Sequence, residues 1–177
     1  VPFKAITFIV GQDPLNKTLK HHYSMIHENK IDMVFRFSTG HDKRVLKVGK
    51  TYHFKPINVR VHTRTKLSET LFRTEVSVFN TSAQGSTYKH HTILFEFNTW
   101  PMEEVTSAEA TQDILSAICL VRKEMKLKNN ALTIFTHDLH GGISGSAVFI
   151  ALYDFLQKID ESLTENNELK RSGGDID

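Results

Sequence analysis

Cysteine is nearly absent from this chain of 177 residues, which contains only Cys119. One cysteine excludes an internal disulfide framework and fits a reducing compartment. No apolar run approaches the roughly 20 residues of a membrane-spanning helix, and the N-terminus lacks the features of a signal peptide. We therefore expect a globular domain that does not itself insert into a membrane.

Net charge is also low, at +2, and the lysines and arginines are scattered among acidic residues. Nucleic-acid binding normally needs a concentrated basic stripe, so nucleic acid is not expected as a partner. A composition of 40% hydrophobic and 24% charged residues is typical of a globular protein. The length fits one domain with a sizeable core, and we expect residues 1–177 to form a single unit.

In the first two thirds of the chain, the spacing of apolar residues is mostly that of β-strands. Apolar residues alternate there, and turn-like clusters at 65–70 and 80–87 predict an antiparallel meander. Asp13 and Pro14 resemble the N-cap and first residue of a helix that continues to about residue 29. The predicted strands cover residues 4–10, 31–37, 57–61, 76–78 and 93–97, with a polar turn region at 38–50.

The last third changes to helical spacing. It predicts a helix over 107–127, with Ser107 as its N-cap and Cys119 in its core, then a strand at 132–137 and a helix at 146–161. These three segments form a compact α/β unit. The positions expected to be buried are Ile114, Ala117, Ile118, Val121 and Met125 on the first helix, and Val148, Ala151, Leu152, Phe155 and Ile159 on the second.

The turn between this strand and the last helix is the most informative segment. Residues 136–147 read Thr-His-Asp-Leu-His-Gly-Gly-Ile-Ser-Gly-Ser-Ala. A strand, a glycine-rich turn and a helix N-terminus together make a phosphate cradle, because backbone N–H groups and the helix dipole converge on the turn. This turn nevertheless contains an acid, Asp138, and no cysteine, lysine or arginine.

The segment resembles the active-site loop of protein tyrosine phosphatases, in which a strand ending His-Cys leads through a loop ending in Arg to a helix beginning Phe-Ile-Ala-Leu. His137 matches the loop histidine, Asp138 stands at the nucleophilic Cys, and Ser144 stands at the phosphate-binding Arg. The loop has one residue more than usual. A count back from the helix therefore places Leu139 and Gly145 at the Cys and Arg positions, and neither register supplies Cys or Arg.

Two further segments resemble the same family, in the family's order. Residues 8–15 are similar to Ile-Ala-Thr-Gln-Gly-Pro-Leu, and Met25-Ile26-His27-Glu28 follows as a counterpart of Met-Ile-Trp-Glu. Residues 95–102 resemble the segment ending Trp-Pro-Asp, with Met102 in place of the general acid Asp. The loop is most similar to that of the inactive, membrane-distal domain of receptor-type phosphatases of the gamma/zeta class, or an invertebrate counterpart.

The resemblance implies an α/β fold with a twisted mixed β-sheet flanked by helices. Compared with the family, the domain is expected to be a fragment, truncated at both ends. The resemblance also implies that three catalytic roles are missing, at Asp138, Ser144 and Met102, and no metal or other cofactor is expected. Glu103 and Glu104 are alternative acids, but a solvated loop is the simpler interpretation.

The vestigial phosphate loop is expected to comprise His137, Asp138, Leu139, His140, Gly141, Gly142, Ile143, Ser144 and Gly145. Two orientations of the Asp138 carboxylate are possible. It can turn inward and accept the loop N–H groups itself, as an internal anion that fills the cradle, or it can face solvent. The inward orientation is favoured, since amides and the helix dipole stabilise a carboxylate there.

The expected function is therefore that of a catalytically inactive domain that acts in receptor signalling by binding proteins. The expected partners are the active phosphatase domain of the same protein, a second receptor, or cytoplasmic signalling proteins. Such a domain would lie in the cytoplasm, tethered to the inner face of the plasma membrane through its parent receptor. A divergent phosphatase with residual activity and a module that binds phosphotyrosine without hydrolysis are the alternatives.

Overall fold

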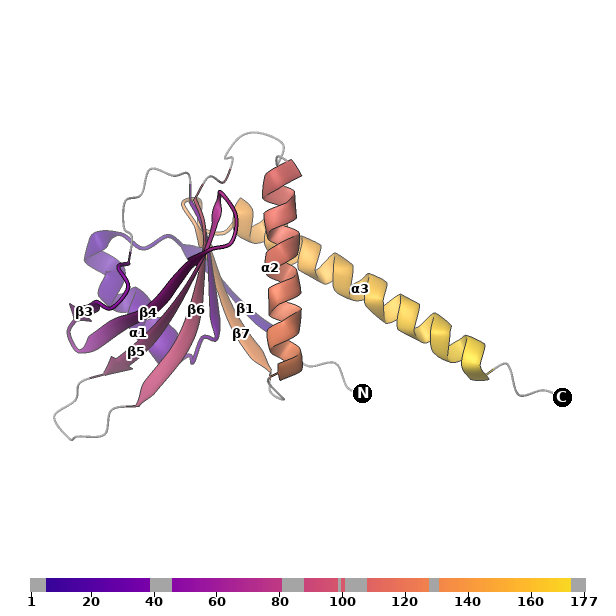
Figure 1. Cartoon of the computed structure of the whole chain (residues 1–177), viewed down its shortest axis with the longest axis horizontal. Helices are drawn as coiled ribbons and strands as arrows, with labels where there is room; N and C mark the ends of the chain where they lie inside the picture. The colour runs from indigo at the N-terminus through magenta and orange to yellow at the C-terminus, as the bar shows by residue number, and fades with distance from the viewer. Residues whose placement is uncertain are drawn as a thin grey trace.

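A computed structural model of the protein describes residues 6–38, 46–80, 88–98, 100, 108–127 and 131–172. These residues form a seven-stranded sheet with helices on both faces, as the sequence predicts (Figure 1). The elements are β1 (Ile6–Gln12), η1 (Asn16–Thr18), α1 (Leu19–Glu28), β2 (Met33–Phe37), β3 (Thr51–Phe54), β4 (Ile57–Lys66), β5 (Leu71–Asn80), β6 (Lys89–Phe97), α2 (Ala108–Leu127), β7 (Leu132–Asp138) and α3 (Gly145–Ser172).

The sheet is mixed, with strand order β1-β7-β2-β6-β5-β4-β3. Strands β1, β7, β2 and β6 are parallel neighbours, and β6, β5, β4 and β3 form the expected antiparallel meander. Strand β3 was not expected from the sequence. The carboxyl ends of β1, β7 and β2 meet at one edge of the sheet, which is where α/β proteins usually place their ligand sites.

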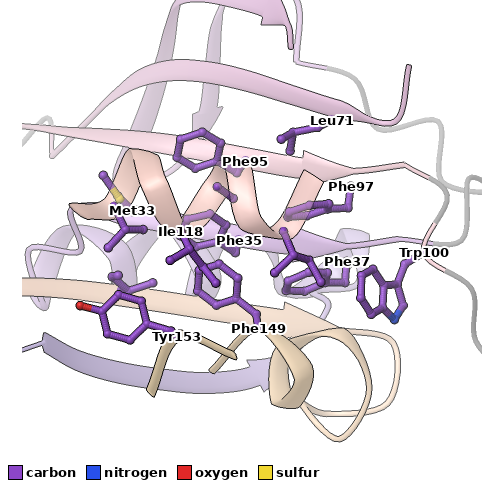
Figure 2. Close-up of a cluster of buried hydrophobic side chains, with 14 of the residues drawn as sticks. Met33, Phe35, Phe37, Leu71, Phe95, Phe97, Trp100, Ile118, Phe149 and Tyr153 are labelled. Carbon is purple, nitrogen blue, oxygen red and sulfur yellow. The ribbon is translucent and has the colours of Figure 1, made fainter. Parts of the chain in front are cut away.

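Helices α2 and α3 cover one face of the sheet, and α1 covers the other (Figure 1). Aromatic rings dominate the core beneath α2 and α3 (Figure 2). Phe35 stacks on Phe95 with ring centroids 4.8 Å apart, and Phe149 of α3 lies 4.4 Å from Phe35. The opposite core is smaller and packs Tyr23 and Ile26 of α1 against the aliphatic side chains of the meander.

The first helix begins later than the sequence predicts. Asp13 is not its N-cap: the chain first forms η1, and α1 begins at Leu19. The reason is that the Asp13 carboxylate binds the guanidinium of Arg36, with both oxygens at 2.8 Å, and so does not cap the helix. The predicted N-cap of α2, Ser107, lies outside the described residues.

The prediction for the last helix is wrong in its length and in its buried face. Helix α3 runs for 28 residues, and its buried aromatic side chains are Phe149 and Tyr153. Of the five positions expected to be buried, only Leu152 packs partly against the core, while Val148, Ala151, Phe155 and Ile159 are exposed. Apolar residues occupy more than half of the helix circumference, so periodicity alone does not select the face that meets the sheet.

Cys119 was also expected in the core and is instead exposed on α2. It follows Ile118, which is buried, and one residue along a helix turns the side chain by about 100°. The other predicted positions of this helix are correct, with Met125 partly buried. None of the described helices combines the length and hydropathy of a membrane span.

The face that α3 buries can be tested with two phenylalanines of the same helix. Phe149→Ala should lower the free energy of unfolding by about 3–5 kcal/mol, because it removes a fully buried ring. Phe155→Ala should change it by no more than about 0.5 kcal/mol, because that ring is 60% exposed. Chemical denaturation of both variants measures the difference, and the reverse order would show that the predicted face is the buried one.

Candidate functional site

The glycine-rich turn lies where the central strand β7 ends and α3 begins. Strand β7 runs between β1 and β2 and ends at Asp138, and α3 begins at Gly145. The backbone N–H of Asp13, which follows β1, donates to the carbonyl oxygen of Asp138 at 2.8 Å. The turn is therefore attached to two neighbouring strands at the carboxyl edge of the sheet.

The side chain of Asp138 points into the turn, and its carboxylate accepts four backbone N–H groups. His140 and Gly142 donate to Oδ1 at 2.9 and 2.8 Å, and Ser144 and Ser146 donate to Oδ2 at 3.4 and 3.3 Å. Asp138 is 2% exposed. Of the two orientations that the sequence allows, the inward one is observed.

The N–H groups also change the acidity of this carboxyl group. Burial by itself raises the pKa of Asp138, but the backbone donors of Gly142, Ser146 and His140 outweigh it and hold the pKa below its usual value. At neutral pH the turn therefore contains a fixed negative charge at the N-terminus of α3. The helix dipole adds to its stabilisation.

Two glycines let the turn close around this carboxylate. Gly142 has a φ of +97°, and a Cβ placed on it would lie 2.0 Å from Cγ1 of Val10. Gly145 starts α3 against the ring of Phe37, which a Cβ would approach to 2.4 Å. Side chains at these two positions would push the turn away from β1 and β2.

Ser144 of the turn contacts a tryptophan. Nε1 of Trp100 donates to Oγ of Ser144 at 3.1 Å. Trp100 is itself buried and packs edge-on against Phe37, with ring centroids 5.0 Å apart (Figure 2). Trp100 is thus attached to the turn through its indole N–H. Met102, Glu103 and Glu104 lie outside the described residues.

The remaining side chains of the turn point in different directions. Ile143 is 81% exposed, and Leu139 and His140 are also at the surface. His137 is buried on the opposite face of the sheet from Asp138, as alternation along a strand requires. Within the described ranges, no three His, Cys, Asp or Glu side chains are grouped closely enough to hold a metal ion.

A partly buried charge network on that opposite face was not found from the sequence. Nδ1 of His137 lies 2.9 Å from Oδ1 of Asp13, whose carboxylate also binds Arg36. Nη1 of Arg36 lies 3.6 Å from Glu96, which contacts Arg64 from the meander. Burial raises the pKa of Asp13, yet the hydrogen bonds from His137 and Arg36 lower it far below its usual value.

A signal for this network is present in the sequence. Arg36 interrupts the apolar strand Met33–Phe37, and Glu96 interrupts Phe95-Glu96-Phe97. A charged residue inside an otherwise buried strand needs a partner of opposite charge. The parallel pairing of β2 with β6 places Arg36 directly opposite Glu96, and this pairing becomes visible only in the sheet.

The stability of the turn should depend on pH through Asp138. Because the pKa of Asp138 is lowered by folding, its charged form stabilises the native state above the unfolded pKa of about 3.9, and this contribution is lost as pH falls through the native pKa. Asp138→Asn should therefore cost about 1–3 kcal/mol at pH 7 and progressively less below about pH 4.

Denaturant unfolding of wild type and variant between pH 3 and 8 measures this difference. Asp154→Asn is a suitable control, since Asp154 is exposed on α3 and its pair with Lys158 is a surface pair. A cost of Asp138→Asn that stays constant or grows on acidification would contradict the assignment of the carboxylate as the anion of the turn.

The geometry agrees with the match of the chain to known families. No curated protein matches the chain. The sequence profile of the protein-tyrosine phosphatase family, in contrast, matches residues 2–170, which include the whole sheet, the turn and nearly all of α3. A match over nearly all of the 177 residues places this chain in the protein-tyrosine phosphatase family.

Proposed function

We propose that this domain is a member of the protein-tyrosine phosphatase family that has no catalytic activity and works by binding other proteins. The observation that carries the proposal is the carboxylate of Asp138, which accepts four N–H groups of the turn. A turn of this kind binds an external anion through such N–H groups. Here they are occupied by an anion that belongs to the chain itself.

The chemistry of phosphoryl transfer also lacks its reacting groups. The family uses a thiolate as nucleophile, and Asp138 stands in its place with both oxygens engaged. An arginine would bind the phosphate through two parallel hydrogen bonds. Ser144 has one hydroxyl group, which accepts a hydrogen bond from Trp100. Removal of a nucleophile alone typically costs several orders of magnitude in rate.

Electrostatics oppose the entry of a phosphate group. Two unit charges about 4 Å apart repel by roughly 4 kcal/mol at an effective dielectric constant of about 20. That energy is comparable to a few good hydrogen bonds, so the carboxylate of Asp138 cancels much of the attraction that the N–H groups and the helix dipole would offer. We therefore expect the turn to reject phosphotyrosine.

A binding role instead relies on the outer surface. Helix α3 exposes apolar side chains, including Phe155 and Leu163, and exposed apolar clusters are typical of protein contacts. By its resemblance to a membrane-distal receptor domain, we propose that the chain binds the active phosphatase domain of its own protein, a second receptor or a signalling protein. The proposed location is the inner face of the plasma membrane, where the parent receptor would hold it.

The first test of this proposal is an activity assay. The purified domain should show no turnover of a small aryl phosphate between pH 5 and 8, because thiolate and arginine are absent from the turn. Asp138→Ala should give the same background rate as the wild type. Turnover that survives purification controls and disappears in Asp138→Ala would overturn the proposal.

The second test is a binding titration with a phosphotyrosine peptide. Wild type should bind it more weakly than millimolar, and Asp138→Asn should bind it at least tenfold more tightly, because the variant removes the repelling charge while the N–H donors stay in place. Isothermal calorimetry on both proteins, with the unphosphorylated peptide as control, measures this. Micromolar binding by the wild type would contradict the prediction.

A further inference from the structure

A second concave site lies on the face of the sheet opposite the α2 and α3 helices. It is a cavity of about 230 Å³ bounded by α1, β3 and the central strands. Its walls are mainly apolar and partly aromatic. The residues that form these walls include Leu19, Tyr23, Val34, Tyr52, Phe54 and Leu94.

The aromatic part of the wall is ordered by its own contacts. Tyr23 of α1 stacks on Phe54 of β3, with ring centroids 5.0 Å apart and planes inclined by 23°. The hydroxyl of Tyr52 accepts the backbone N–H of Lys47 at 2.9 Å, which orients the phenol ring. A third ring inserted here would meet aromatic edges and faces that are already in place.

The polar end of the cavity is the charge network already described. Asp13, His22, Arg36, Glu96 and His137 line it, and Arg64 reaches Glu96 from the meander. Each of the two carboxylates contacts a guanidinium group, Asp13 with Arg36 and Glu96 with Arg36 and Arg64. A ligand with a full charge would find no opposite charge in excess and would lose its hydration.

This cavity is separate from the glycine-rich turn that contains Asp138. His137 lines the cavity, whereas Asp138, the next residue, faces the other side of the sheet and fills the turn. Asp13, which lines the cavity, links the two sites through the backbone, since its N–H donates to the carbonyl of Asp138 at 2.8 Å. A ligand in the cavity would therefore not occupy the position of the family's phosphate.

We propose that the cavity binds an uncharged aromatic group of the phenol or indole class. Its size fits, because an apolar cavity of roughly 150 Å³ already accepts benzene, and about 230 Å³ leaves room for a substituent or a second ring. The apolar walls provide most of the contact, and the polar end provides hydrogen-bonding groups for a hydroxyl or an indole N–H. Apolar cavities with a few convergent polar groups are the usual ligand sites of proteins.

The direct test is a titration followed by backbone amide NMR shifts. Phenol and indole should shift the amides of Tyr23, Val34 and Leu94 in a saturable manner. Benzoate and benzylammonium should bind at least tenfold more weakly, because the charged groups of the polar end already pair with one another and a charged ring would lose its hydration. The proposal is overturned if neither neutral ring shifts these amides, or if a charged ring binds as tightly as the neutral ones.

Three variants locate the binding. Leu19→Trp fills the cavity from the half-buried side of α1 and should abolish the shifts, and Tyr52→Ala should weaken indole binding at least fivefold. Tyr88→Ala, which removes a tyrosine that does not line the cavity, should leave binding unchanged. If Tyr52→Ala does not fold, Leu19→Trp decides: unchanged indole binding in folded Leu19→Trp overturns the proposal.

The aromatic group could belong to a free small molecule or to a side chain of a protein partner. N-acetyltryptophanamide and short peptides with a central tryptophan distinguish these sources. If a peptide binds at least tenfold more tightly than N-acetyltryptophanamide, and Leu19→Trp abolishes its binding, the natural ligand is a side chain of a protein partner. Equal affinities that are both lost in Leu19→Trp support a free small molecule. Failure of both probes to bind overturns the proposal.

Discussion

The hydrogen bonds between the Asp138 carboxylate and the N–H groups of the turn are the interaction on which the site depends. They fix the path of the chain from β7 into α3, and they satisfy donors at a helix N-terminus that would otherwise need a ligand or water. Gly142 and Gly145 allow the turn to lie close to Val10 and Phe37. A turn whose N–H groups could bind an external anion is in this way stabilised by a carboxylate of the chain itself.

Two consecutive residues of β7 connect both faces of the sheet. Asp138 belongs to the turn beneath α3, and His137 belongs to the charge network beneath α1. Asp13 joins them, since its carboxylate contacts His137 and its backbone N–H donates to Asp138. The turn and the charge network are therefore linked across the sheet at its carboxyl edge, and the cavity lies beside the network.

The domain has the strand, turn and helix of its family, and the residues in the turn bond to one another and to Trp100. The strand, turn and helix that position a nucleophile are retained, and Trp100 still contacts the turn, through Ser144. In the turn, the carboxylate of Asp138 accepts backbone N–H groups, and the hydroxyl of Ser144 accepts the indole N–H of Trp100.

The sequence by itself determined most of the strands, the antiparallel meander and the glycine-rich turn, because the alternation of apolar residues and the positions of glycines are local properties of the chain. It also favoured the inward Asp138, since any carboxylate beside several N–H groups at a helix N-terminus is stabilised there. Tertiary structure alone decided that Asp13 binds Arg36 instead of capping a helix, that Cys119 faces outward, and that α3 buries Phe149 and not Phe155. These outcomes depend on which strands become neighbours and on which side of a helix meets the sheet, and such long-range pairings leave no periodic trace in the sequence.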